Sequence, residues 1–292
     1  MNPINVNRII CVLLWLICAS YASGTEQTKS TPAERSNPAA VDKILEKLNK
    51  TVMGLTSYES QIEYKFIQPY MFDTQTLRQG SFYYIKKGND SKLRLNFQTL
   101  QQDDEKQQKD IKQYVVVDGA LLTDTDRKFS GYWFVNIDYE FKTVRYTQIS
   151  EANDPNNPVD VFDLISRYLP IVGFTNVDDW KKQFDISIIE QNKSNNLIQI
   201  NLKVKSDSVY NDNYVYIDCW IDKKLNLPVK ITAVSTEPAT EPDEQKERCE
   251  INFTAPKINQ EIDNKIFDFE IPKGFGEPEM IPLNNNNNIN NQ

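Results

Sequence analysis

The sequence predicts a mainly β (α+β) fold: a single curved antiparallel sheet forming an incomplete β-barrel. An N-terminal helix and a mid-chain helical insert are expected to cover its concave face. Three observations lead to this expectation. Apolar and polar residues alternate at a period of two over most of the chain. Only two longer stretches have helical spacing, one near the N-terminus and one in the middle. A sheet with one apolar face must also curl or be covered to hide that face.

The first 22 residues have the layout of a secretory signal peptide. Arg8 precedes an apolar run over residues 9–19, and small residues follow around Ala22. This run is too short to span a bilayer comfortably. We therefore expect an exported protein that is cleaved after Ala22 or after Gly24. Residues 23–38 then form a flexible tether rich in Ser, Thr, Glu, Lys and Pro.

Residues 39–276 are expected to form one domain that starts with a helix. Pro38 opens this helix and Gly54 closes it. Its apolar positions follow the i, i+3, i+4, i+7 spacing of one buried stripe. They are Val41, Ile44, Leu45, Leu48 and Val52.

From Tyr58 onwards the period changes to two, which predicts strands. Residues 80–97 read as a hairpin, because Gly88, Asn89 and Asp90 have the chemistry of a turn. Residues 101–112 are charged and rich in Gln, so we expect a loop there. Strands resume at QYVVVDG, ALLTD and GYWFVNIDY.

The helical insert is predicted over residues 160–174, where Pro170 ends a helical stripe. A short helical turn around Val177 and Trp180 follows. The β pattern returns at residues 184–189, 197–204, 214–220, 229–234 and 251–253. An Asn-rich tail over residues 277–292 is expected to be disordered, with its Asn tract starting at Asn284.

The composition argues against several classes of protein. The 33 basic and 41 acidic residues give a net charge of −8, which disfavours binding to nucleic acid. The chain has no histidine, so Ser-His-Asp and Cys-His sites and His-ligated zinc are absent. The acidic residues around Asp124 and Asp126 lack the spacing of a calcium loop, which favours turn chemistry. We therefore expect no enzyme, no metal and no cofactor.

The order of the segments resembles the periplasmic outer-membrane lipoprotein carrier family (LolA-like) and its lipoprotein-sorting relatives. The phrases that carry this resemblance are GSFYYIKK, SKLRLNF, VVVDGALLTD, CWIDKKLNLPVKI and the closing FDFEIPKGF. The resemblance implies a half-barrel whose apolar cavity carries lipoprotein acyl chains through the periplasm. The partners it implies are an inner-membrane lipoprotein-releasing transporter and an outer-membrane acceptor. Lys87 stands where the family has an arginine linked to lid opening.

A carrier of acyl chains needs large apolar side chains around its cavity, because each buried methylene contributes about 0.8 kcal/mol. The residues expected to line the cavity are Tyr64, Phe66, Phe82, Tyr84, Leu93, Leu95, Phe97, Val116, Phe134, Phe162, Ile165 and Leu169. The alternative is that these residues form an ordinary packed core. The residues that compete for the inward position are Tyr83, Ile85, Trp133 and Val135.

Two smaller groups of residues have alternative interpretations. Lys87 and Arg94 are candidates for the cavity rim or a partner contact, or they belong to a solvated turn. Cys219 and Cys249 follow the signal segment and form a possible disulfide in an oxidising compartment. If the strand at 229–234 lies between them, they are too far apart to bond and remain thiols.

The sequence as a whole predicts a monomeric periplasmic carrier or chaperone that binds lipoprotein acyl chains or a similar lipid. The alternative is a non-enzymatic envelope sensor or protein-interaction module on the same fold. An enzyme that works with paired carboxylates is the third and least favoured hypothesis.

Overall fold

The computed structural model describes residues 38–69, 74–88, 90–102, 105–119, 122, 129–150, 161–162, 170–171, 177–189, 196–236 and 246–283. All of them belong to one compact unit, Arg35–Gln292. The predicted signal peptide, nearly all of the tether and the Asn tract lie outside the described residues. So do most of the helical insert and of the predicted strand ALLTD. No helix within the described ranges has the length and hydropathy needed to cross a membrane.

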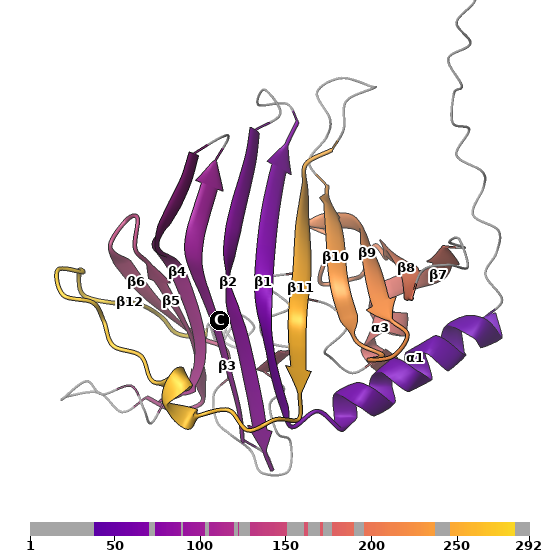
Figure 1. Cartoon of the computed structure of the whole chain (residues 1–292), viewed down its shortest axis with the longest axis horizontal. Helices are drawn as coiled ribbons and strands as arrows, with labels where there is room; N and C mark the ends of the chain where they lie inside the picture. The colour runs from indigo at the N-terminus through magenta and orange to yellow at the C-terminus, as the bar shows by residue number, and fades with distance from the viewer. Residues whose placement is uncertain are drawn as a thin grey trace, which may run out of the picture. The chain divides into compact units, whose positions relative to one another are not determined.

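A single 12-stranded sheet dominates the described chain (Figure 1). Its strands are β1 (Ser57–Gln68), β2 (Thr74–Lys87), β3 (Asp90–Gln102), β4 (Glu105–Asp118), β5 (Tyr132–Asp138), β6 (Thr143–Gln148), β7 (Phe184–Ile189), β8 (Leu197–Val204), β9 (Tyr214–Asp222), β10 (Pro228–Ser235), β11 (Arg248–Ile258) and β12 (Glu279–Ile281). Their order is β12-β6-β5-β4-β3-β2-β1-β11-β10-β9-β8-β7, and the two ends of the sheet do not meet. The open, curved sheet was predicted correctly.

The sheet is mixed, which corrects the prediction of a purely antiparallel one. β12 runs parallel to β6, whereas the other neighbouring strands are antiparallel. At its centre β1 pairs with β11, so that Tyr64 faces Ile251 and Phe66 faces Cys249. This pairing joins the two halves of the sequence into one sheet.

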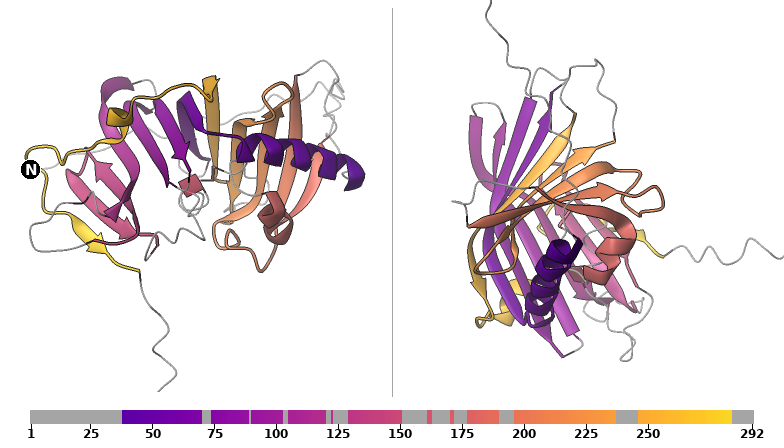
Figure 2. Two further views of the ribbon diagram at one scale, coloured as in Figure 1. Left: turned by 90° about the horizontal axis from the view of Figure 1, so that it is seen from below. Right: turned by 90° about the vertical axis from the view of Figure 1, so that its right-hand side faces the viewer.

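Two helices, α1 and α3, lie on the concave side of the sheet (Figure 2). α1 (Pro38–Met53) buries Val41, Leu45 and Leu48, which belong to the predicted stripe. Its end is closed by a hydrogen bond from the Gly54 N–H to the Lys50 carbonyl at 3.2 Å. α3 (Val177–Gln183) contacts α1 and β7, and its Trp180 is buried. The described part of the insert adds the buried residues Val161, Phe162 and Ile171 to the same core.

The convex face of β4, β5 and β6 carries a second hydrophobic core. Its buried residues include Val115, Trp133 and Val135. The C-terminal segment, which contains the short helix η2 (Asn264–Phe267) and β12, covers this core. Three of its apolar side chains pack there: Phe269, Phe275 and Met280.

Two predicted boundaries are wrong. Residues 279–281, expected within the disordered tail, form β12, which β6 and the 2.8 Å Arg145–Glu279 ion pair hold. A strand of three residues is too short to show a period. Much of the predicted loop at 101–112 belongs to β3 and β4, whose ends pair as a hairpin. The side chains of residues 105–110 are exposed, so the sequence there has no alternation to reveal the strand.

Candidate functional site: the concave face of the sheet

The register of β1, β2 and β3 divides the concave face into two parts. The part near α1, here called the proximal half, contains Tyr58, Phe82, Tyr84, Leu93 and Leu95. The part towards the C-terminal end of β1, here called the distal half, contains Tyr64, Phe66, Arg78 and Leu100. In Figure 1, β1 points away from α1, so the distal half lies far from this helix.

The proximal half is filled with side chains. Phe162 packs on Tyr84 and Phe82, with ring centroids 4.2 Å and 5.9 Å apart. Eight of the residues expected to line a cavity are at most 5% exposed: Phe82, Tyr84, Leu93, Leu95, Phe97, Val116, Phe134 and Phe162. For these eight residues the structure shows the alternative to a cavity lining, namely an ordinary packed core. Ile165 and Leu169 lie outside the described residues.

A row of aromatic rings starts at Tyr64 in the distal half and runs diagonally to Phe134, at the level of the proximal half. Tyr64 lies 6.2 Å from Phe97, and Phe97 lies 6.3 Å from Tyr114, both in edge-on contacts. Tyr114 stacks on Phe134 at 5.5 Å. Tyr64 on β1 reaches Phe97 on β3 across β2, because Gly80 has no side chain where it pairs with Phe97. A Cβ atom at Gly80 would lie 1.7 Å from the Asn96 carbonyl oxygen.

A pocket of about 260 Å³ lies beside this row, over β1, β11, β10 and β9. The residues around it are Tyr64, Phe66, Asp212, Asn213, Tyr214, Ala233, Ser235, Thr236, Glu247, Arg248 and Cys249. Only Tyr64 and Phe66 of the predicted lining residues border it. Sequence reasoning missed Tyr214 and Cys249, although strand alternation places Cys249 on the same face as Ile251.

The polar atoms among these buried side chains are uncharged near neutral pH. Burial raises the pKa of Tyr64 and of Tyr214 well above the usual value for tyrosine. Burial also raises the pKa of the Cys249 thiol to about 11, although a hydrogen bond from Tyr64 lowers it. The pocket therefore combines neutral aromatic and thiol groups with charged residues at its border, Asp212, Glu247 and Arg248.

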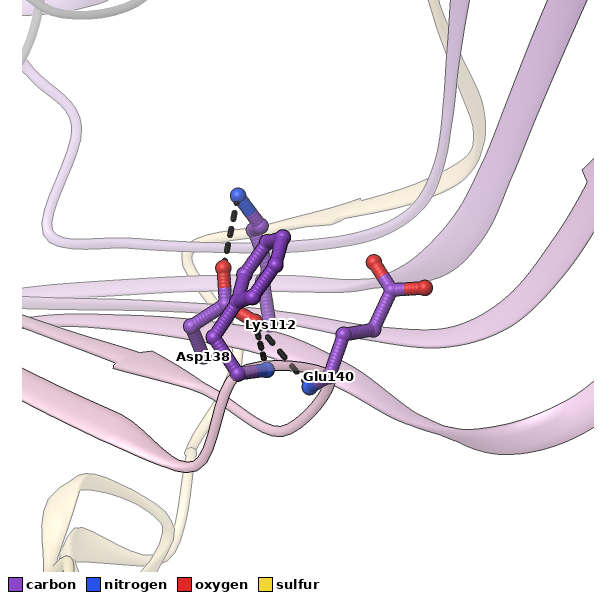
Figure 3. Close-up of polar contacts among 4 residues, drawn as sticks. Lys112, Asp138 and Glu140 are labelled. Carbon is purple, nitrogen blue, oxygen red and sulfur yellow. Dashed lines mark hydrogen bonds and ion pairs between the residues drawn. The ribbon is translucent and has the colours of Figure 1, made fainter. Parts of the chain in front are cut away.

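The charge of Lys112, on the same face beyond Phe97, is already neutralised (Figure 3). Its Nζ lies 2.9 Å from Oδ2 of Asp138. The other carboxylate oxygen accepts hydrogen bonds from the N–H groups of Glu140 at 3.0 Å and Phe141 at 3.1 Å. This arrangement fixes the turn between β5 and β6 and holds Lys112 in an ion pair.

Arg94 and Lys87 do not lie at the rim of the pocket. Arg94 alternates with the inward Leu93 and Leu95, so it projects from the convex face. There it donates hydrogen bonds to the carbonyl oxygens of Ile266, at 2.8 Å, and Asp268. Lys87 is exposed and borders a separate groove of about 790 Å³ at the end of β1 and β2. Sequence alone does not show that the C-terminal segment occupies the face of Arg94.

Cys219 and Cys249 are both free and buried. Cys219 pairs with Ile231, and Cys249 pairs with Ala233, so β10 lies between the two cysteine strands. Strands separated by one neighbour are about 9.6 Å apart, which is beyond the reach of a disulfide. The structure therefore supports two separate thiols and not a disulfide.

Comparison of the sequence with protein-family models and with curated proteins finds no match. Solved structures with a similar fold include the lipoprotein LppX of Mycobacterium tuberculosis, at 11% identity, covering 78% of this chain and 99% of that one, with a TM-score of 0.38. A DUF1329 family protein from Desulfovibrio piger shares 12% identity over 78% of this chain and 97% of its own, with a TM-score of 0.39.

A LolA superfamily protein from Nitrosomonas europaea is also similar. It shares 12% identity and covers 78% of this chain and 97% of its own, with a TM-score of 0.28. The similar structures thus include the superfamily that the sequence resembles. At these values the likeness concerns the fold alone, and the function has to be argued from the chain's own residues.

Proposed function

We propose that this protein is an exported, non-enzymatic lipid-binding protein whose distal half binds an acyl chain. The observation that carries the proposal is that Tyr64 and Phe66, at one end of the aromatic row, are partly exposed at the border of the pocket. Tyr64 and Phe66 are only partly buried, whereas the predicted lining residues of the proximal half are fully packed. A ligand chain that covers these two rings would remove further apolar area from water.

The size of the pocket limits what it can hold. Its 260 Å³ is slightly below the roughly 300–1,000 Å³ of typical ligand pockets. One acyl chain therefore has to extend from the pocket over the partly exposed rings of Tyr64 and Phe66. The several chains of a lipoprotein need a wider space, which movement of α1 away from the sheet would open.

The family resemblance extends this proposal to a periplasmic carrier for lipoproteins or a similar lipid. Such a carrier receives its cargo from an inner-membrane releasing transporter and delivers it to an outer-membrane acceptor. The second candidate is an envelope sensor or protein-interaction module. The dense packing of the proximal half favours it, because a module that binds only proteins needs no cavity there.

Mass spectrometry of organic extracts from the purified exported protein tests lipid binding directly. We expect acyl lipids in amounts comparable to the protein. The variant Phe66→Gln replaces an apolar ring at the border of the pocket with a polar amide. In this variant we expect the amount of bound lipid per protein to fall several-fold. The matched control is Lys65→Gln, because alternation places Lys65 on the opposite face of β1.

Equal lipid content in Phe66→Gln and Lys65→Gln would contradict the assignment of the distal half. A protein without extractable lipid that retains a stoichiometric protein partner would support the interaction module instead.

A further inference from the structure

We propose that Arg78 is the head-group site for an anionic amphiphile, whose chain passes over the Tyr64 ring into the pocket. The inference rests on the proposed lipid binding and adds the chemical class of the lipid. The ligand combines an alkyl chain with a carboxylate or a phosphate group.

Arg78 lies on the concave floor of the distal half. It is on β2, paired with Tyr64 on one side and with Leu100 on the other. Its Nε atom is buried, and no described residue accepts a hydrogen bond from it. Buried donors without an acceptor are rare in folded proteins, because leaving them unpaired costs free energy. An arginine that remains in such a position points to an acceptor other than the described residues, and we propose that a ligand supplies it.

The neighbouring charges are engaged elsewhere. Lys112 is paired with Asp138 at 2.9 Å. The Glu63 carboxylate lies on the convex side, where it accepts from Gln79 at 2.6 Å. Among the described residues no carboxylate forms an ion pair with Arg78. The chain has a net charge of −8, so the guanidinium of Arg78 is a positively charged group on a protein that is negatively charged overall.

The surroundings of Arg78 fit an amphiphile better than a free anion. Arg78 pairs directly with Tyr64 across β1 and β2, so the two side chains are neighbours on the same face. Burial raises the pKa of Tyr64, and the charge of Arg78 acts against this rise. Tyr64 also borders the pocket, so a chain that starts at Arg78 reaches the pocket by crossing one ring.

A guanidinium presents donors in a planar fork that matches a carboxylate or phosphate group. An anionic head group bound at Arg78 would accept a hydrogen bond from the buried Nε–H group. The apolar chain would cover Tyr64 and Phe66, which the chain alone leaves partly exposed.

The test compares dodecanoate with dodecanol, which share the same chain but differ in charge, by isothermal titration of the delipidated protein. We expect dodecanoate to bind about tenfold or more tightly than dodecanol. Arg78→Gln should remove this preference, so that dodecanoate and dodecanol bind the variant with similar affinity. Arg78→Lys should keep part of it, and Lys65→Gln, which removes a cation from the opposite face, should keep all of it.

Equal binding of dodecanoate and dodecanol to the native protein would overturn the role of Arg78 and leave the proposed function standing. A preference that survives Arg78→Gln would do the same. Acetate that binds as tightly as dodecanoate would show a site for free anions and overturn the amphiphile. Absence of binding by both long-chain compounds would overturn the proposed function itself. Thermal melting of each variant checks that the sheet is intact.

Discussion

At the scale of single residues, Gly80 controls the packing of β2 against β3. A Cβ at this position would lie 1.7 Å from the Asn96 carbonyl oxygen and 2.9 Å from the Phe97 Cα. Both are backbone atoms, so no side-chain rotation can relieve the contact. We expect Gly80→Ala to lower the free energy of unfolding by about 3 kcal/mol, measured by urea denaturation.

Gly276→Ala is the matched control for this change. No atom lies within 4 Å of a Cβ built at Gly276. The free energy of unfolding of Gly276→Ala should stay within about 0.5 kcal/mol of that of the native protein. If the two variants were equally stable, the close approach of β2 and β3 at Gly80 would be refuted.

The thiol of Cys249 makes stability depend on alkaline pH. Burial raises the pKa of Cys249 from 9.0 to about 11 in the folded protein. As the pH rises, the unfolded chain releases this proton first. The contribution of the thiol is therefore fully present below pH 9 and is lost as the pH rises towards 11. Its full loss amounts to about 3 kcal/mol.

Denaturation of the native protein and of Cys249→Ala over this pH range measures the effect. The native protein should lose stability more steeply with pH than the variant. Parallel curves for the two proteins would show that the thiol is not buried as described. Cys219, whose pKa burial also raises, is present in both proteins and does not affect the comparison.

Residue types on strand faces were the best-predicted part of the candidate site. Alternation placed Tyr64, Phe66, Phe82 and Tyr84 on one face, and the structure shows them together on the concave side. Alternation cannot tell which part of a face other elements cover. That depends on where α1 and Phe162 pack, which is a property of tertiary structure.

At the scale of elements, hydrogen bonds from Arg94 hold the C-terminal segment against the sheet. Its guanidinium binds the carbonyls of Ile266 and Asp268 on one side and Asn96 and Gln113 of the sheet on the other. Arg94→Met should lower the free energy of unfolding by about 2 kcal/mol. It should also speed amide hydrogen exchange across residues 264–281, measured by mass spectrometry.

Lys92→Met serves as the control, because Lys92 lies on the same face of β3 two residues away. Its exchange pattern in the C-terminal segment should match that of the native protein. Similar exchange in both variants would mean that aromatic packing alone holds the segment, through pairs such as Tyr139–Phe275.

Elements with a strong period were predicted closely. The predicted strands 184–189 and 197–204 match β7 and β8, and the helical stripe matches α1. The polar ends of β3 and β4 were missed, because main-chain pairing with the neighbouring strand holds them rather than burial of a face. β12 was missed for a related reason: its three residues pair with β6 and bury little.

At the scale of the whole molecule, β12 protects one end of the sheet. Its removal would leave the backbone N–H and C=O groups of β6 unpaired, and such edges pair with other chains. We expect a protein that ends at Pro278 to self-associate, as measured by size-exclusion chromatography with light scattering. A protein that ends at Leu283 loses only residues 284–292 and should remain a monomer.

If both truncated proteins were monomers with equal melting temperatures, β12 would not protect this edge. Association of the Leu283 form would instead assign a protective role to the Asn tract.

The pairing of β1 with β11 also bears on how the chain reaches its native state. The partners at the centre of the sheet, such as Tyr64 and Ile251, are separated by most of the chain. Contacts between distant segments require costly loop closure and make folding slow. A chain threaded through a translocation pore from its N-terminus cannot complete this sheet until β11 has passed. Slow closure is therefore compatible with the proposed export, because a native sheet that formed early would block passage.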